Sequence, residues 1–414
     1  MSRGCRSSMG RRARRGVEIA GALLTIAGCT SRGAAVGAVA SDLKPRPPGD
    51  APTPPSSSGR LAPGHTRERL LYVANDATSA LDVFDIDAGH RRLRSISLPG
   101  TRFRGVTAHA ASARLYFTES STDTVGAVDL LTERVVWARS YQEPHACKHP
   151  DRLNVTLDGK VLYVPCADSD RVLFVDAPTG QVDAVRSIPK SPHNTFTGES
   201  GKYMYVSTHE GGPLYLFEPG THVLAREIGP FSSSIRPFTV DEAEAHAYAN
   251  LTDLLGFAAI DLASGRIEEL AQETPAERRS HPEASAGRPH AGAPFSHGIA
   301  LRPGSRELWF LDDEWGYLYV YDTSTSPPSH QADVPLFTDL ARPWTQGAYR
   351  WVAFDVDGRY CYPSDGSVVD AEAKALVPDA HISPSEKLIE IDFEGGRPIR
   401  VSGQNGGVYP PRSP

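Results

Sequence analysis

Residues 70–85 read LLYVANDATSALDVFD, and residues 161–176 follow the same plan as VLYVPCADSDRVLFVD. Each stretch holds an apolar run around a tyrosine, a polar turn, and a second apolar run that ends in an acidic residue. Seven copies occur, with their aromatic residues at Tyr72, Tyr116, Tyr163, Tyr205, Tyr248, Trp309 and Tyr362. The matching acidic residues are Asp85, Asp129, Asp176, Glu218, Asp261, Asp322 and Asp370. This regularity predicts one β-hairpin in every copy.

The spacing of the copies predicts the fold. The aromatic residues stand 44, 47, 42, 43, 61 and 53 positions apart, and a unit of forty-odd residues with several short strands is typical of a propeller blade. We therefore predict an all-β fold, a seven-bladed β-propeller over residues 67–400. Residues 387–393 are expected to close the ring beside the first blade. Insertions at roughly 267–295 and 325–347 are predicted to be loops.

Two of the units resemble a known repeat. LYVAN…LDVFDIDAG and LYVPCADSDRVLFVDAPTGQV look like YVTN repeats, as in YncE-type bacterial seven-bladed propellers, and the resemblance covers about residues 68–395. It implies membership of a propeller superfamily that includes lactonase-like enzymes, subunits of redox enzymes and binding proteins without chemistry. A fold shared by so many activities does not indicate which of them this chain has.

The N-terminal residues predict export. A basic segment precedes an apolar stretch over 19–28, which is shorter than the roughly 20 residues that span a bilayer and is typical of a signal peptide. The stretch ends in LTIAGC, which resembles a bacterial lipobox, so residues 1–29 are predicted to be a signal peptide with Cys29 lipidated. A cut after Ala40 is the alternative and would leave a periplasmic or secreted protein. Both outcomes predict an exported protein of the bacterial cell envelope.

Composition sets the expectations for the flanking segments and for partners. Residues 30–66 are rich in Pro and Ser and are predicted to be a disordered linker, and residues 401–414 a flexible C-terminal tail. The net charge of -7 gives no basic face for nucleic acid. The sequence holds no Cys-x-x-Cys-His, nucleophile-elbow or phosphate-loop pattern. No cofactor is predicted, and the propeller is expected to be a monomer.

One position of the repeat carries cations. The residue twelve positions before each aromatic residue should begin the innermost strand, at one mouth of the central channel. These residues are Arg60, Arg104, Asp151, His193, Arg236, His297 and Arg350. Six of the seven are Arg or His, and Arg152 stands beside the exception. Converging arginines bind carboxylate or phosphate, so these cations and Asn194 are predicted to bind an anionic ligand; alternatively, they only hydrogen-bond neighbouring blades.

The histidines of this ring are the candidates for acid–base chemistry. His193 and His297 titrate near neutral pH and could act as a general acid or base. No carboxylate stands at a fixed short spacing from either residue. Carboxylates at the ends of the aromatic strands are expected near the same mouth.

A cysteine with flanking histidines precedes the third blade. His145, Cys147 and His149, with His209 added, are candidate ligands for zinc or copper, although their spacing matches no established metal motif. A polar loop is the alternative that we favour. Cys147 is also predicted to form a disulfide with Cys166 in an oxidising compartment.

Three functions follow from these features. The first is a binding protein of the cell envelope that captures an anionic small molecule or a partner protein. The second is a lactonase-like hydrolase or another small-molecule enzyme that uses His193 or His297. The third is a metal-binding or redox-partner propeller. A histidine with a carboxylate partner would favour the enzyme, exposed tryptophans (Trp315, Trp344 and Trp351) the binding protein, and converging His and Cys residues the redox role.

Overall fold

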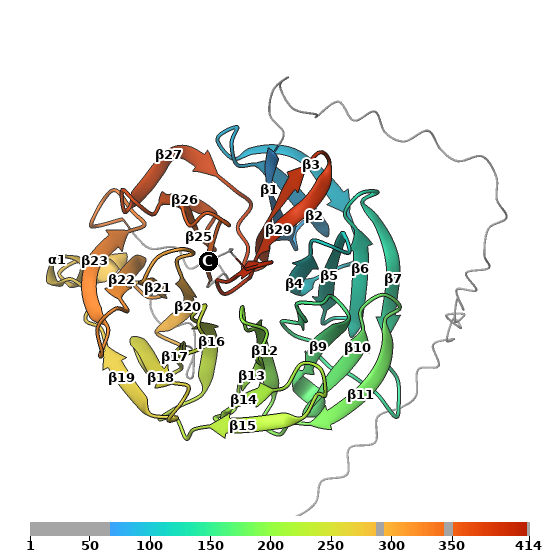
Figure 1. Ribbon diagram of the computed structural model, residues 1–414. Helices are drawn as coiled ribbons and strands as arrows, with labels where there is room; N and C mark the ends of the chain where they lie inside the picture. Colours follow the sequence, from blue (N-terminus) through green and yellow to red (C-terminus); the bar gives the residue numbers. More distant parts are fainter. Residues whose placement is uncertain (1–66, 287–293, 343–350, 412–414) are drawn as a thin grey trace, which may run out of the picture. The chain divides into compact units, whose positions relative to one another are not determined.

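The computed structural model describes residues 67–286, 294–342 and 351–411. Within these ranges the strands form seven sheets around a common centre (Figure 1). This is the all-β, seven-bladed propeller that the repeat predicts. Cys29 and the predicted signal peptide and linker lie outside the described residues. No helix in the described ranges is long and apolar enough to cross a membrane.

Each blade has four strands, numbered here from the centre outward. The innermost strands are β28 (Leu388–Glu394), β4 (Phe103–His109), β8 (Asn154–Val155), β12 (Pro192–Thr197), β16 (Ile235–Val240), β20 (Ser296–Leu301) and β24 (Val352–Phe354). The second strands are β1 (Arg67–Asn75), β5 (Arg114–Glu119), β9 (Val161–Cys166), β13 (Met204–Thr208), β17 (His246–Leu251), β21 (Glu307–Asp312) and β25 (Tyr360–Pro363).

The outer half of each blade completes the hairpins. The third strands are β2 (Ala80–Asp85), β6 (Thr124–Asp129), β10 (Arg171–Asp176), β14 (Leu214–Phe217), β18 (Gly256–Asp261), β22 (Tyr317–Asp322) and β26 (Ser367–Asp370). The outermost strands are β3 (Arg91–Ser97), β7 (Arg134–Ser140), β11 (Gln181–Ser187), β15 (Leu224–Ile228), β19 (Ile267–Ala271), β23 (Ser329–Pro335) and β27 (Ala375–His381). Short helical turns are η1 (Ala167–Ser169), α1 (Ala276–Arg279) and η2 (Pro282–Ala284).

The repeat's aromatic residues build the cores between blades. All seven lie in second strands and are at most 3% exposed. Tyr163 packs edge-on against Phe174 of its own blade and Phe217 of the next blade, with ring centroids 4.7 and 6.0 Å away. Each aromatic side chain therefore covers a sheet face that one blade alone would leave in water.

The repeat's acidic residues hold the turns. Asp129 Oδ1 accepts hydrogen bonds from the backbone N–H groups of Leu131 and Thr132 at 2.9 and 2.8 Å. Asp370 accepts from Glu372 and Ala373 in the same way. An Asp at the start of a turn satisfies N–H groups that no strand pairs, which explains the Asp of six copies, while Glu218 of the fourth blade accepts from the Thr221 hydroxyl.

The ring closes with a strand from the C-terminal part of the chain. Strand β28 pairs antiparallel with β1, with Tyr72 opposite Ile389, so the predicted closing strand is confirmed. Arg69 of β1 crosses this joint. Its Nε donates to Glu390 of β28 at 2.9 Å, and its Nη2 donates to Asp355 at 2.5 Å. Both carboxylates are fully buried.

Two boundary predictions are wrong. The insertions begin later than expected, because residues 267–271 and 329–335 are outermost strands and the α1 and η2 turns follow the first of them. The C-terminal segment is not a flexible tail over its described part. Strands β29 (Arg397–Ser402) and β30 (Val408–Tyr409) extend the closing sheet beyond β28, and residues 401–409 are all buried. The backbone hydrogen bonds offered by the inner edge of β28 account for this order.

We expect the Arg69→Ala substitution to destabilise the protein by about 3–5 kcal/mol, because it leaves the carboxylates of Glu390 and Asp355 buried without their cation. Urea unfolding of the variant and the parent protein measures this difference. Arg266→Ala is the matched control, since its ion pair with Glu268 is exposed and should cost under about 1 kcal/mol. Equal losses in the two variants would contradict the role given to Arg69.

Candidate functional site

Four of the seven predicted ring residues sit in β-bulges at the start of innermost strands, while Asp151 precedes β8 and Arg60 and Arg350 lie outside the described residues. In β12 the register slips between Pro192 and Thr195, which leaves His193 and Asn194 opposite one residue of β13. The same slip occurs in three other innermost strands, at Arg104, at Arg236–Pro237 and at His297–Gly298. A bulge redirects a side chain out of the regular alternation of a strand. The bulge therefore gives the cationic position a structural cause.

Asp151, the one acidic residue of the ring, is the partner of its neighbours on both sides. Its Oδ2 accepts from Arg104 Nη2 at 2.8 Å and lies 2.7 Å from His193 Nδ1. Asp151 is 1% exposed. Burial opposes its charge, but the hydrogen bond from His193 and the guanidinium groups of Arg104 and Arg152 hold the pKa of Asp151 well below its usual range. Asp151 is thus a buried carboxylate that joins three blades.

His193 is therefore a neutral imidazole of defined tautomer. Burial lowers the pKa of His193 more than the attraction of Asp151 raises it. Because Asp151 is an acceptor, Nδ1 of His193 carries the proton and Nε2 carries a lone pair. Nε2 is buried and has no hydrogen-bond partner among the described residues, and the same holds for both amide atoms of Asn194. Buried polar atoms normally have partners, so these atoms point to a ligand or to bound water.

His209, which follows β13, lies beside His193. The two ring centroids are 4.9 Å apart. His209 Nε2 contacts Arg236 Nη1, and Arg236 Nε donates to Thr252 Oγ1 at 2.8 Å. Burial, with repulsion from His193 and Arg236, lowers the pKa of His209 to about 3. His209 is thus neutral at pH 7 and accepts a hydrogen bond from the guanidinium group.

A second buried ion pair completes the site. Arg152 is 2% exposed; its Nη2 donates to Glu386 Oε2 at 2.5 Å, and its guanidinium carbon lies 4.0 Å from the centroid of the Trp351 ring. Lys387 Nζ lies 3.9 Å from Glu386 and 3.6 Å from Asp76. Burial would raise the pKa of Glu386, but the charges of Arg152 and Lys387 lower it to about 2. These contacts reach both sides of the ring closure.

We call this group the channel-end cluster. It consists of Arg104, Asp151, Arg152, His193, His209, Arg236 and Glu386. The ring register identified four of these residues, Arg104, Asp151, His193 and Arg236, and Arg152 was noted beside Asp151. It missed the role of Asp151, although Asp151 was the one acid in a cationic position. His209 was considered only as a metal ligand, and Glu386 carried no repeat signal at all.

Of the remaining candidates, His297 lies near the cluster, since its charge contributes to the lowered pKa of Glu386. His297 occupies the bulge of β20, with its ring centroid 5.9 Å from that of Trp351. Trp351 is 1% exposed and Trp315 is half-buried, so neither offers an open aromatic surface. Arg350 and Trp344 lie outside the described residues.

The metal candidates do not converge in the described part of the chain. His149 lies 3.7 Å from Asp168, and its backbone N–H donates to Asp123, while His145 belongs to the preceding loop. Within the described residues, no group of three or more His, Cys, Asp and Glu side chains is placed to hold a metal ion.

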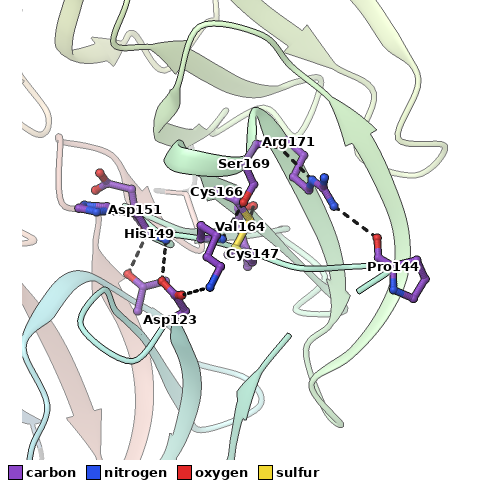
Figure 2. The surroundings of a disulfide bond; sticks show 11 residues. Asp123, Pro144, Cys147, His149, Asp151, Val164, Cys166, Ser169 and Arg171 are labelled. Atoms are coloured by element: carbon purple, nitrogen blue, oxygen red, sulfur yellow. Dashed lines mark hydrogen bonds and ion pairs between the residues drawn. A yellow bond between two sulfur atoms is a disulfide. The ribbon is translucent and has the colours of Figure 1, made fainter. Parts of the chain in front are cut away.

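A disulfide joins Cys147 to Cys166, at the end of β9 (Figure 2). It anchors the segment that leads to Asp151. Beside it, Pro150 forms a bridge with Cys166, and the Asp151 N–H donates to the Pro165 carbonyl at 2.9 Å. The predicted pairing is present, and its place in the fold ties it to the site.

We expect the Cys147→Ala/Cys166→Ala double variant to be less stable by roughly 3 kcal/mol, because the disulfide closes a loop with a sequence separation of 19 and so restricts the unfolded chain. Thermal unfolding without reductant measures the loss. Cys361→Ala serves as a comparison, since Cys361 is a buried free thiol in another blade. A double variant as stable as the parent would show that the disulfide does not hold this segment.

Comparisons with known proteins support the fold alone. Neither a protein-family model nor a curated protein matches the sequence. Hydrazine synthase of Kuenenia stuttgartiensis is 18% identical with a TM-score of 0.51, over 66% of this chain and 80% of that chain. The dihydro-heme d1 dehydrogenase NirN, in complex with DHE, is 14% identical with a TM-score of 0.50, over 79% and 75%.

A third structure, the β-propeller domain of Cps50 (Swd1) from Myceliophteria thermophila, is 12% identical with a TM-score of 0.53, over 73% of this chain and 96% of that chain. At such low identities a structural likeness establishes the propeller architecture and no activity. The resemblance to YVTN repeats stays a prediction.

Proposed function

We propose that this propeller binds an anionic small molecule at the channel-end cluster. The observation that carries the proposal is the buried His193, whose Nε2 has no partner in the described residues and whose ring lies within the electrostatic influence of Arg152 and Arg104. Arg104 pairs with Asp151 and Arg152 with Glu386 there, Lys387 beside the cluster lies near Glu386 and Asp76, and Arg236 contacts His209 and Thr252. Arginine forks held in place by neighbours suit a carboxylate or phosphate.

The same proposal places the protein in the bacterial cell envelope. Its support is the signal-like N-terminus, with Cys29 as the lipidated residue and the Pro- and Ser-rich segment as a spacer. Metabolic labelling with palmitate, lost in the Cys29→Ser variant, would support the anchor. Export without labelling would favour the cut after Ala40. The propeller is proposed to act as a monomer.

We expect an anion that fits the site to raise the Tm, because a ligand of the folded state stabilises it. Thermal unfolding with inorganic phosphate, citrate and gluconate tests this, with each variant compared with its own ligand-free Tm. Arg104→Ala and His193→Ala should lose the rise. Arg139→Ala should keep it, since Arg139 bonds only the exposed carbonyl of Thr179. A rise that survives in both site variants would sink the proposal.

The Asp151–His193 pair favours hydrolysis as the second candidate function. In this reaction His193 Nε2 takes a proton from water, and the water oxygen attacks the carbonyl carbon of a lactone or ester. The carbon–oxygen bond to the leaving oxygen then breaks, and the proton passes from His193 to that oxygen. Asp151 holds the imidazole and stabilises its charged form, as the acid does in a catalytic triad. His297, whose ring lies beside Trp351, is the alternative base.

Hydrolysis predicts a particular pH profile. The base acts when neutral, and burial lowers the pKa of His193 below its ordinary value. The rate should therefore be flat at neutral pH and fall only in acid, at a pH below the 6.5 of an ordinary histidine. Assays with gluconolactone and p-nitrophenyl acetate measure this. His193→Gln and Asp151→Asn should each lower turnover by about 100-fold or more, and unchanged turnover in both would exclude the reaction.

A further inference from the structure

Two extra strands extend the closing sheet toward the centre of the ring. In the closing sheet the strand order runs β3-β2-β1-β28-β29-β30. Since β28 is the innermost strand of this blade, β29 and β30 continue the sheet toward the axis. The seven-bladed pattern of four strands per sheet does not require these two strands.

The segment between these strands touches the innermost strands of four other blades. The Tyr409 hydroxyl donates to the Thr197 carbonyl of β12 at 2.6 Å. Trp351, just before β24, donates from its indole N–H to the Gln404 carbonyl at 2.6 Å. Gly406 lies against Thr239 of β16 and Leu301 of β20, where an added Cβ would stand 3.1 Å from Thr239 Oγ1 and from the Leu301 carbonyl oxygen. These contacts span the ring.

Most of these contacts lie at the end of the ring away from the channel-end cluster. Thr197 and Leu301 are the last residues of β12 and β20, whose first residues carry His193 and His297. Residues 403–407 form a turn in which the Gly403 N–H donates to the Gly407 carbonyl at 2.9 Å. Gly406 has a φ of 90° and Gly407 of 80°, a conformation that side chains with a Cβ rarely adopt.

One contact connects this segment with the cluster. The Trp351 indole is fixed on one edge by the Gln404 carbonyl and carries the Arg152 guanidinium over its face at 4.0 Å. A cation over an indole is attracted by the ring's negative face. Arg152 in turn donates to Glu386 and lies 3.6 Å from Asp151. Gln404 therefore bears on the geometry of the cluster through a single buried ring.

We propose that residues 403–409 are a plug. They fill the centre of the ring from the end opposite the channel-end cluster, so a ligand approaches from one side only, and they position Arg152 by fixing Trp351. The plug itself does not depend on the proposed function. The part of the proposal that concerns ligand affinity rests on that function, and Gln404 and Trp351 are positioning residues in it.

Hydrogen exchange tests the plug without any ligand. In a chain that ends after Ser402, the bond from the Trp351 indole N–H to the Gln404 carbonyl is absent. The indole N–H should therefore exchange about tenfold faster or more, because no hydrogen bond has to open before it exchanges. The indole N–H of Trp137 is an internal control, since Trp137 lies in the outermost strand β7 and donates to the Ala177 carbonyl, and its exchange should not change. Tyr409→Phe, which removes only the hydroxyl bonded to Thr197, is the milder variant and should shift Trp351 in the same direction.

Affinity for citrate, measured by titration calorimetry, tests the positioning role. Trp351→Phe keeps a ring under Arg152 but loses the indole N–H, and it should weaken citrate binding about fivefold or more. Trp137→Phe loses an equivalent indole–carbonyl bond far from the cluster and should leave citrate binding unchanged.

The outcomes separate the two proposals. If the parent protein binds none of the tested anions, the proposed function fails while the exchange rates still decide on the plug. Unchanged exchange at Trp351 in both the shortened chain and Tyr409→Phe would overturn the plug. Equal weakening of citrate binding by Trp351→Phe and Trp137→Phe would overturn the positioning role.

Discussion

The antiparallel pairing of β28 with β1 is the contact on which the rest of the molecule depends. Each blade buries one face of its sheet only against a neighbour, so an open ring would leave the sheets of both terminal blades in water. The joint is made by residues more than three hundred positions apart, such as Leu70 and Ile391. Arg69 adds charge to it by bonding Glu390 and Asp355.

The candidate site also depends on this joint. Glu386 and Lys387 immediately precede β28, and Asp76 immediately follows β1, so the second ion-pair group forms only when the ring closes. Asp151, in contrast, is held within the third blade by the Pro165 carbonyl and the nearby disulfide. A buried cation such as Arg152 needs both a carboxylate and a fixed place. Glu386, just before the closing strand, supplies the carboxylate, and the Trp351 ring fixes the position of the Arg152 guanidinium.

The sequence predicts the architecture well because a repeat states the same information seven times. Tyr72, Tyr163 and Tyr362 fall in equivalent strands although no single copy would identify a propeller. The ring position is predictable for the same reason, since the bulge that produces it recurs at Arg104, His193, Arg236 and His297.

What the sequence does not show are contacts outside the repeat. Glu386 meets Arg152 across 234 positions, and no periodicity connects them. Residues 401–409 have a Gly-rich composition that is typical of a flexible tail, yet the glycines are needed because the turn at Gly406 and Gly407 is packed against other blades. A Gly-rich composition is therefore compatible both with a flexible tail and with a tightly packed turn, so composition alone does not distinguish the two.

The two ends of the innermost strands differ in how their polar side chains are hydrogen-bonded. Toward the far end, threonine side chains join neighbouring blades: Thr195 Oγ1 donates to the Arg152 carbonyl and Thr197 Oγ1 to the Val155 carbonyl, both at 2.8 Å. Those bonds satisfy the polar groups that line the axis. At the bulged end, His193 Nε2 and the Asn194 amide are left without partners in the described residues.

A buried polar atom without a partner costs about 1–3 kcal/mol, and the same strand shows that the fold can satisfy such atoms with threonine. In β12 the unsatisfied atoms of His193 and Asn194 therefore lie at the end where the chain leaves regular pairing and gathers its cations. Filling the opposite end with residues 403–409 is consistent with this division, because a ligand site needs one approach, and a second opening would only admit water to the buried charges. The position of the bulges thus decides which end of the propeller is available for a ligand.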